Sequence, residues 1–572
     1  MEESCIGHEV SLMFKAERIW FLVALMLLAV VGCDAPTPPK PKTKTTTSKI
    51  ATKLATGPKQ ETTKIVRKRR TKPPEERGER TEPEQTESEF DFSFDSSSNF
   101  SYEGGGAFSR SQNESRPGLS SGQIIERVTS LLRDSIEYAP TLAVWLIDES
   151  KSARGFVGGV GGTLRQPYSG LKQEADANQF LTAVCTFGQQ VRFPVDTPSS
   201  DPATLINAFG ALQEDVSGKE MLFTAVGESL KKYASYRTSQ KREVLFFIVT
   251  DEAGDDQTAA EDVIKEVRKQ GIPIYVIGVP APLGRAAAVD ASVEVAGIAT
   301  SIQQGPESRV SEHIELGFWG GMNDYRLVDS GFGPFALERL CRASNGRYIA
   351  LRPSTTGYSF VGETNTEWPN SGVWQPDPNA MRKYAPDYVS EAEYQAILQA
   401  NAACMALCNA AKLPRVEFAQ LPETTFVKQS EPQLSADVAR AQKLAAKLEP
   451  VVNRLYDALA RGESARDKLT SPRWKASYDL ALGRAAAAKA RVDGYNAMLA
   501  ELKRGKNFTD DSHNTWQLME NETTEASSGL KKLCAKAKGY LKGVAKEHPG
   551  TPWAKLAERE LQTPVGWKWT ES

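Results

Sequence analysis

The chain has 572 residues, which is too long for one compact core and predicts two or three domains. Its hydrophobic share of 40% and charged share of 25% are ordinary for a globular protein, and its net charge of −2 argues against a chain built as a whole to bind polyanions. Seven cysteines are too few for a disulfide scaffold, and the four histidines lack metal-ligand spacing, which counts against a zinc hydrolase.

The N-terminus has the pattern of an export signal followed by an anchor. Lys15 and Arg18 precede an apolar run at 19–31 that is short for a membrane span and suits the h-region of a signal peptide. The run ends in Val-Val-Gly-Cys33, which resembles the lipobox of bacterial lipoproteins. That resemblance implies a signal peptide over 1–33, lipidation of Cys33, and a membrane-anchored protein in the periplasm or at the cell surface. The alternative is a plain membrane anchor with an incidental cysteine.

Residues 34–122 lack apolar periodicity and are rich in Pro, Thr, Ser, Lys and Glu, which predicts a disordered charged tether. Basic residues dominate 40–72 and acidic residues dominate 75–95. We interpret the segment as a solvated spacer. The alternative is that the basic run at 67–70 contacts anionic lipid or wall polymer. An exported chain is not expected to meet nucleic acid.

Apolar runs alternate with helical patterns over 123–355. The runs have the continuous apolar character of strands buried on both faces, and they lie at 141–147, 180–187, 244–250, 274–279 and 347–351. The amphipathic helical patterns lie at 124–136, 203–212, 225–234, 259–270 and 334–343. This alternation predicts an α/β domain with a doubly wound, mostly parallel, Rossmann-like sheet, and it places any ligand at the carboxyl ends of the strands.

Oxygen donors at alternate positions directly follow the first predicted strand. They form an Asp148-x-Ser150-x-Ser152 pattern, in which a carboxylate and two hydroxyls can converge on one hard cation. The pattern resembles the metal-ion-dependent adhesion site of the von Willebrand factor A (vWA) family. In that family a threonine from a later loop and an aspartate after the fourth strand complete the site, which implies Thr224 and Asp251 here.

The resemblance implies a binding function. The expected ion is Mg²⁺ or Mn²⁺, and its open coordination position would take an acidic side chain of a protein partner. One departure is that Lys151 and Arg154 flank the last serine, where the family often has Gly and Met; Glu149 and Glu252 are available to offset their charge. The alternative is a metal-free domain that serves as a structural scaffold of the cell envelope.

The sequence shows no catalytic cluster, so we expect a binding protein and not an enzyme. Ser150 has no histidine near it in sequence and no Gly-x-Ser-x-Gly elbow around it. Asp251 and Asp255 form a carboxylate pair that could perform acid–base chemistry. The preferred interpretation is one metal ligand and one turn or capping residue.

Residues 281–335 are longer than a usual strand-to-helix connection and predict an insertion in the domain. An extra strand or hairpin is expected at 308–318. Phe318, Trp319 and Tyr325 are candidates either for a partner surface or for core packing.

The C-terminal part predicts a linker at 356–389, rich in Pro, Asn and Trp, and an α-helical domain at 390–572. Helical patterns at 390–412, 435–461, 471–503 and 517–546 favour an antiparallel bundle or coiled coil, or a helical repeat pair. Cys404 and Cys408 would lie one helical turn apart, as core cysteines or with one of them bridged to Cys534.

The end of the chain, from 547 to 569, resembles the ends of planctomycete cell-surface proteins that combine an exported A-type domain with alanine-rich helices. This resemblance assigns no chemistry. Trp553, Trp567 and Trp569 are interpreted as packing residues.

Overall fold

The computed structural model describes the chain from residue 121 onward, with short gaps. The described residues are 121–174, 178–285, 289–295, 298–304, 306–320, 328–351, 358–360, 376–418, 422–524 and 526–572. The predicted signal segment, Cys33 and nearly all of the predicted tether lie outside them. All the described residues fall within one compact unit. Within these ranges, no helix combines the length and the apolar character needed to cross a bilayer.

A six-stranded sheet forms the centre of the α/β part. Its order is β3-β2-β1-β4-β5-β8, and every neighbouring pair is parallel except β2 with β3. The strands are β1 (Thr141–Asp148), β2 (Phe180–Phe187), β3 (Val191–Arg192), β4 (Glu243–Val249), β5 (Ile274–Gly278) and β8 (Arg347–Ala350). The direction in which successive strands are added reverses between β1 and β4. The loops after these two neighbouring strands therefore share one edge of the sheet, where ligands of such folds bind.

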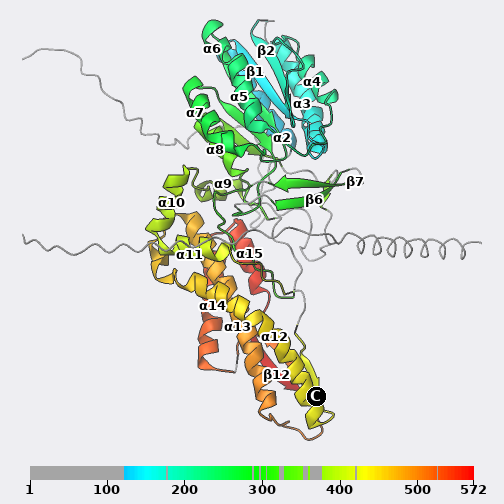
Figure 1. Ribbon diagram of the computed structural model, residues 1–572, viewed down its shortest axis with the longest axis vertical. Helices are drawn as coiled ribbons and strands as arrows, with labels where there is room; N and C mark the ends of the chain where they lie inside the picture. Colours follow the sequence, from blue (N-terminus) through cyan, green and yellow to red (C-terminus); the bar gives the residue numbers. More distant parts are fainter. Residues whose placement is uncertain are drawn as a thin grey trace, which may run out of the picture. The chain divides into compact units, whose positions relative to one another are not determined.

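Helices cover both faces of this sheet (Figure 1). One face packs against α2 (Ser121–Tyr138), α3 (Arg154–Glu174) and α4 (Ala203–Gly210). The other packs against α5 (Leu222–Tyr233), α7 (Ala260–Gln270) and α8 (Phe335–Ala343); α6 (Ser235–Ser239) and the 3-10 turn η1 (Gln257–Ala259) are short connections. Successive residues of β1 alternate between the two cores, since Val144 packs on the α5 side and Trp145 on the α3 side. This doubly covered, mostly parallel sheet is the fold class that the sequence predicts.

Helix α3 is an element that the sequence patterns did not predict. Its glycines and Pro167 lower its helix propensity, so the segment did not stand out as helical. Its apolar residues nevertheless recur at helical spacing and are buried, among them Phe156, Val160 and Leu164. A Cβ atom on Gly161 would lie 2.6 Å from Cγ of Phe209, so this glycine permits close packing against α4.

The insertion differs from the prediction. The hairpin is formed by β6 (Val289–Val295) and β7 (Ile298–Gln304), and β9 (Tyr358–Phe360), which falls in the predicted linker, adds a third strand. The strand or hairpin predicted at 308–318 is therefore wrong: residues 306–320 form an irregular segment. Phe318 and Trp319 are buried in hydrophobic cores, in agreement with core packing, because this segment packs against the helical part. Tyr325 lies outside the described residues.

The C-terminal part is mainly helical but includes a sheet. Its helices are α9 (Pro378–Met381), α10 (Glu391–Ala400), α11 (Ala402–Ala411), α12 (Glu431–Ala460), α13 (Pro472–Lys503), α14 (Ser528–Glu547) and α15 (Pro552–Leu561), with the 3-10 turns η3 (Arg382–Tyr384) and η4 (Glu463–Lys468). The single helix predicted at 390–412 is two helices, because the Asn401 side chain accepts a hydrogen bond from the backbone N–H of Ala403 and starts a new one.

A helix predicted over 517–546 is only partly correct. The segment begins with β11 (Thr515–Asn521), which pairs with β10 (Thr425–Val427) and β12 (Gly566–Glu571) in an antiparallel sheet. Trp516 and Leu518 are buried while Gln517 and Met519 are exposed, which is the two-residue period of a strand. The strand is short, and the longer helical pattern that follows it led to the prediction of a helix over the whole segment.

Buried cysteines and tryptophans support packing roles. Cys404, Cys408 and Cys534 are buried free thiols, so the alternative of a disulfide to Cys534 is not realised. The predicted packing residues of the C-terminus are likewise in hydrophobic cores: Trp553, Trp567 and Trp569.

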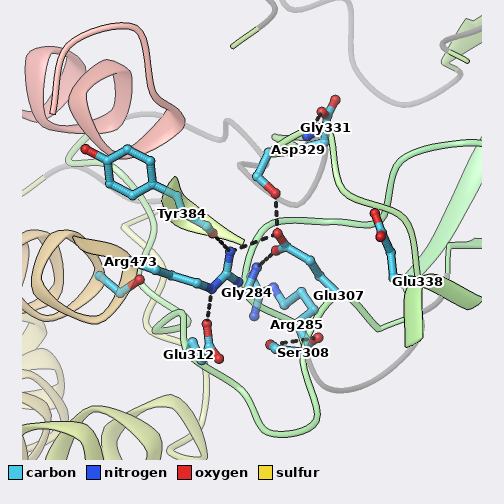
Figure 2. Close-up of polar contacts among 12 residues, drawn as sticks. Gly284, Arg285, Glu307, Ser308, Glu312, Asp329, Gly331, Glu338, Tyr384 and Arg473 are labelled. Atoms are coloured by element: carbon cyan, nitrogen blue, oxygen red, sulfur yellow. Dashed lines mark hydrogen bonds and ion pairs between the residues drawn. The ribbon is translucent and has the colours of Figure 1, made fainter. Parts of the chain in front are cut away.

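Buried ion pairs join the irregular segment to helix α13 (Figure 2). The Arg473 guanidinium lies 3.0 Å from a carboxylate oxygen of Glu307 and 2.6 Å from one of Glu312. It also donates a hydrogen bond of 3.3 Å to the backbone oxygen of Tyr384. Further along α13, Arg484 and Arg491 lie 3.0 and 2.5 Å from the carboxylate of Glu560, which belongs to α15. These carboxylates are buried together with the cations that offset their charge.

Candidate metal centre

Asp148 and Asp251 lie at the edge of the sheet where β1 and β4 end side by side. Asp148 is the last residue of β1, and Asp251 follows β4 by two residues. The Thr250 hydroxyl donates a hydrogen bond of 2.6 Å to Oδ2 of Asp148. The backbone N–H of Ser150 donates one of 2.8 Å to Oδ1 of the same carboxylate. The structure thus brings these two predicted residues into one neighbourhood and fixes the orientation of Asp148.

The two serines extend this neighbourhood. The Oγ atoms of Ser150 and Ser152 are 3.0 Å apart. The Ser152 hydroxyl also donates a hydrogen bond of 3.1 Å to Oε1 of Glu252. The backbone of Asp215 bonds both Glu149 and Lys151, which holds the loop of the motif in place. Two hydroxyls and the Glu252 carboxylate therefore form a connected row of oxygens.

Thr224 is held by a different residue. It lies in the first turn of α5, where its hydroxyl and its backbone N–H donate hydrogen bonds of 2.6 and 2.7 Å to Oδ2 of Asp256. Oδ1 of Asp256 accepts from the backbone N–H of Phe223 at 3.0 Å, so this aspartate caps the helix. In the described part of the chain, no hydrogen bond joins Thr224 to the other four predicted ligands. Its role as a ligand stays a prediction.

Burial raises the pKa values of the carboxylates at this edge. The pKa of Asp148 rises to about 6 because the side chain is buried, although hydrogen bonds from Thr250 and Ser150 partly oppose the rise. The pKa of Asp251 lies well above its usual value, because of burial and then because of the negative charges of Asp148 and Glu252. Burial and the neighbouring acids Glu252, Asp148 and Asp255 raise the pKa of Glu220 to about 9.

The charges of these acids are not offset by ion pairs in the part of the chain that the structure describes. Among the described residues, no Lys, Arg or His forms an ion pair with Asp148, Asp251 or Glu220. The flanking base Arg154 pairs with Glu214 at 2.6 Å instead. Neither carboxylate oxygen of Asp251, which is 1% exposed, accepts a hydrogen bond from another described residue. A buried carboxylate in this condition either takes up a proton, as its raised pKa indicates, or needs a cation that offsets its charge.

The donor set suits a hard cation only if the hydroxyls take part. Within the described ranges, no group of three or more His, Cys, Asp or Glu side chains is arranged to hold a metal. A site here would therefore combine Asp148 and Asp251 with the hydroxyls of Ser150 and Ser152, a set of oxygens that Mg²⁺ and Mn²⁺ accept.

Asp255 has a local structural role. Its carboxylate accepts a hydrogen bond of 3.0 Å from the backbone N–H of Glu220, and its own N–H donates one of 2.8 Å to the Glu220 carbonyl. Gly254, with φ of +78°, makes the turn that allows this pairing. Asp255 thus holds a turn, which is the role that the sequence favoured over acid–base chemistry.

Sequence reasoning missed Glu220 and Asp256 at this edge. Both contact their partners across more than thirty residues of chain, as in the hydrogen bond from Thr224 to Asp256, where the separation is 32 residues. No local pattern marks such pairs, so only the fold could reveal them.

Solved structures with some likeness to this chain include the N-terminal domain of TFIIH p34, at 10% identity over 38% of this chain and 92% of that chain, with a TM-score of 0.25. One is a von Willebrand factor A domain. It is the VWA domain of SpRpn10, at 12% identity over 38% of this chain and 89% of that chain, with a TM-score of 0.22. Proximal thread matrix protein 1 from the mussel byssus has 15% identity over 25% of this chain and 36% of that chain, with a TM-score of 0.20.

No protein-family model matches the sequence, and no curated protein does. The three structural likenesses are too weak to carry a functional argument. The case for a function therefore depends on the site itself.

Proposed function

We propose that this chain is a metal-dependent binding protein. In this proposal Asp148, Ser150, Ser152 and Asp251 hold Mg²⁺ or Mn²⁺, and the bound ion takes an acidic side chain of a protein partner. The observation that carries the proposal is Asp251, whose buried carboxylate has neither a hydrogen-bond donor nor an ion-pair partner among the described residues. A divalent cation would supply the missing positive charge.

The spacing of the hydroxyls supports the same assignment. Neighbouring oxygen ligands in an octahedral magnesium shell are about 3.0 Å apart, because each lies about 2.1 Å from the ion at a right angle to the next. Ser150 and Ser152 place their oxygens 3.0 Å apart, and Ser152 and Glu252 place theirs 3.1 Å apart. These separations are those of hydrogen bonds between the side chains, and they are also compatible with such a shell.

The burial pattern indicates how a partner would approach. Asp148, Ser150 and Asp251 are buried, whereas Ser152 is only partly buried. A visiting side chain would reach the ion from the Ser152 side. The ion would supply positive charge for a carboxylate, while Thr250 and the Ser150 backbone keep Asp148 oriented.

Export and anchoring are part of the proposal. The supporting evidence is the apolar run at 19–31 that ends at Cys33. We expect Cys33→Ser to release the protein from the membrane fraction, with Cys5→Ser as the matched control that leaves it there. Equal membrane association of the two variants would contradict lipidation at Cys33.

Titration calorimetry with Mg²⁺ tests the metal part. The wild-type chain should give a saturable heat, and Asp148→Ala and Asp251→Asn should abolish it. Crosslinking in envelope extracts, with and without EDTA, tests the partner part: the crosslinked species should disappear when the metal is removed.

A metal-free scaffold is the competing function. The observation that favours a metal-free domain is that the described ranges hold no group of three or more His, Cys, Asp or Glu side chains arranged to bind a metal. Absence of magnesium heat in the wild type, with crosslinks that persist in EDTA, would favour this function.

A further inference from the structure

Helix α14 concentrates positive charge in a chain whose net charge is −2. Its 20 residues include six lysines and one acid, Glu547. Two of the lysines, Lys536 and Lys538, pair with acids of neighbouring segments. The other four are exposed and form no ion pair in the part of the chain that the structure describes. These four, called the α14 lysines below, are Lys531, Lys532, Lys542 and Lys546.

The α14 lysines lie along one side of the helix. At 3.6 residues per turn, Lys531, Lys542 and Lys546 fall within about 60° of one another around the axis, and Lys532 flanks them. With a rise of 1.5 Å per residue, the row is about 22 Å long. The opposite side of α14 is buried in a hydrophobic core. Its buried residues are Cys534, Ala537, Leu541 and Val544.

Small residues separate the α14 lysines. Every exposed residue of α14 between 531 and 546 is Lys, Ala or Gly. A Cβ atom added at Gly539 or Gly543 would meet no atom within 4 Å, so packing inside the chain does not require glycine at either position. The exposed side of α14 is therefore a flat face from which lysine side chains project.

This distribution of charge is unfavourable for the helix itself. The N-terminal end of a helix carries a partial positive charge and favours acids, yet the first turn of α14 has none and Lys531 and Lys532 follow it directly. Lys542 and Lys546 are four residues apart, where two like charges repel each other. An external array of negative charges would relieve both effects.

Helix α7 shows the more usual arrangement. Its lysines have acids of the same helix as partners, since Lys265 lies 3.0 Å from Asp262 and Lys269 lies 3.6 Å from Glu266. Acids also occupy its first turn and basic residues its last turn. Helix α14 therefore differs from α7 in having lysines whose counter-charge is not on the same surface.

The shape of the row favours a planar array of anions. A single small anion needs donors that converge on one point, whereas the α14 lysines are spread along about 22 Å. Binding to nucleic acid commonly adds Arg contacts and aromatic stacking on bases. Helix α14 has no Arg, and its aromatic residue Tyr540 is half-buried and donates a hydrogen bond to Glu463. The acidic run at 75–95 of this chain has a nearer counter-charge in the basic run at 40–72.

We propose that the α14 lysines bind the surface of a membrane that contains anionic lipids, so that the exposed side of α14 faces the lipid phosphates. Clusters of four or more lysines on an amphipathic helix are attracted to such surfaces. The apolar side of α14 stays in the hydrophobic core, so the contact is electrostatic and involves no insertion of the helix. This inference depends neither on the metal site nor on lipidation of Cys33.

Co-sedimentation of the full chain with lipid vesicles tests the proposal. Vesicles of phosphatidylcholine with phosphatidylglycerol supply the anionic surface, and vesicles of phosphatidylcholine alone are the neutral control. Every protein carries glutamine at positions 67–70, so that the basic run there does not mask the contribution of α14. The α14 variant combines Lys531→Gln, Lys532→Gln, Lys542→Gln and Lys546→Gln.

A matched control removes the same amount of charge elsewhere. It changes four lysines outside α14 that are also exposed and also form no ion pair in the described ranges. The control variant combines Lys231→Gln, Lys412→Gln, Lys443→Gln and Lys447→Gln. Its comparison with the α14 variant separates the position of the charge from its amount.

The parent chain should bind anionic vesicles and bind neutral ones far less. Each lysine near an anionic surface contributes about a fivefold gain in partitioning, so the α14 variant should bind several hundredfold more weakly, and the control variant should lose far less. About 1 M NaCl should abolish the binding, because the Debye length is then about 3 Å. The thermal unfolding temperature of the α14 variant should not fall, because repulsion between lysines has been removed.

Three outcomes would overturn the proposal. One is a parent chain that binds anionic and neutral vesicles equally, or neither. Another is an equal loss of binding in the α14 variant and the control variant, since overall charge would then explain the attraction. The third is binding of single-stranded DNA through the α14 lysines without binding of vesicles, which would assign this surface to nucleic acid.

Discussion

Asp251 and Glu560 are both almost fully buried carboxylates, and their pKa values are shifted in opposite directions. Burial, together with the negative charges of Asp148 and Glu252, raises the pKa of Asp251 well above its usual value. Burial alone would raise the pKa of Glu560 as well, but Arg491 and Arg484 hold it below its usual value. The difference between the sheet edge and helix α13 is therefore the presence of built-in cations.

This difference indicates which region offsets its buried negative charges with cations of the same chain. The ion pairs of α13 offset the buried negative charges with cations of the chain itself. The sheet edge keeps Asp148, Asp251 and Glu220 together without an ion-pair partner among the described residues. A protein that tolerates such a cost at one place usually does so for function, because perturbed titratable groups concentrate at functional sites.

The largest expected effect comes from removing a buried cation of helix α13. Arg473→Ala leaves Glu307 and Glu312 buried without their cation, so the free energy of unfolding should fall by about 3–5 kcal/mol in urea denaturation. Arg440→Ala is the control, since that exposed side chain pairs with Glu423 at 3.2 Å, and its removal should lower the free energy of unfolding far less than that of Arg473. Equal losses of unfolding free energy in the two variants would contradict a special role of the buried cation Arg473.

The second-largest effect is expected at the sheet edge, where added Mg²⁺ should stabilise the fold. With Mg²⁺ at about one hundred times its dissociation constant, the wild type should gain about 2.7 kcal/mol in its free energy of unfolding. Asp251→Asn should gain nothing from Mg²⁺, and in EDTA it should be at least as stable as the wild type, because asparagine is neutral whereas burial and the neighbouring acids oppose ionisation of the aspartate. A variant less stable than the wild type in EDTA would show that Asp251 has a structural partner.

A smaller effect is expected on the pH dependence of stability, from the buried imidazole of His548. Burial lowers the pKa of His548 to about 4, while its Nδ1 lies 2.8 Å from the Tyr384 hydroxyl. Because the folded pKa is lower than the unfolded pKa of about 6.5, stability is present above pH 6.5 and is lost as the pH falls towards 4.

Between pH 7 and pH 5 the wild type should lose about 2 kcal/mol more than His548→Asn, as measured by urea denaturation at each pH. Asparagine can keep a hydrogen bond to Tyr384 but does not titrate in this range. Parallel pH profiles for the two proteins would exclude His548 as the source of the loss.

The smallest effect concerns Thr224. Thr224→Val removes the hydroxyl that donates to Asp256, which should lower the free energy of unfolding by about 1 kcal/mol. If Thr224 only starts helix α5, magnesium affinity by calorimetry should change much less than in Ser152→Ala. Similar losses of magnesium affinity in Thr224→Val and Ser152→Ala would indicate that Thr224 is a metal ligand.

The sequence predicted what depends on local pattern. The continuous apolar runs located β1, β4 and β5. The expectation that the residues after β1 and β4 would meet came from the resemblance of the Asp-x-Ser-x-Ser motif to the vWA family. The sequence did not predict helix α3, because its glycines lower the helix propensity of the segment. It did not predict β11, because the two-residue period of that strand lies directly before a long helical pattern.

Partners that are distant in sequence could not be predicted. Arg473 and Glu307 are separated by 166 residues, and nothing local in either segment indicates the other. Glu252 was recognised only as a charge beside the motif, since its contact with Ser152 spans 100 residues and depends on how two loops meet.

A divalent cation is proposed to bind where β1 and β4 end, and an anomalous-difference map from crystals grown with Mn²⁺ would locate it. We expect a peak in coordination contact with the hydroxyls of Ser150 and Ser152, beside Asp148 and Asp251. A map with Mn²⁺ bound elsewhere and no peak among these four residues would contradict it.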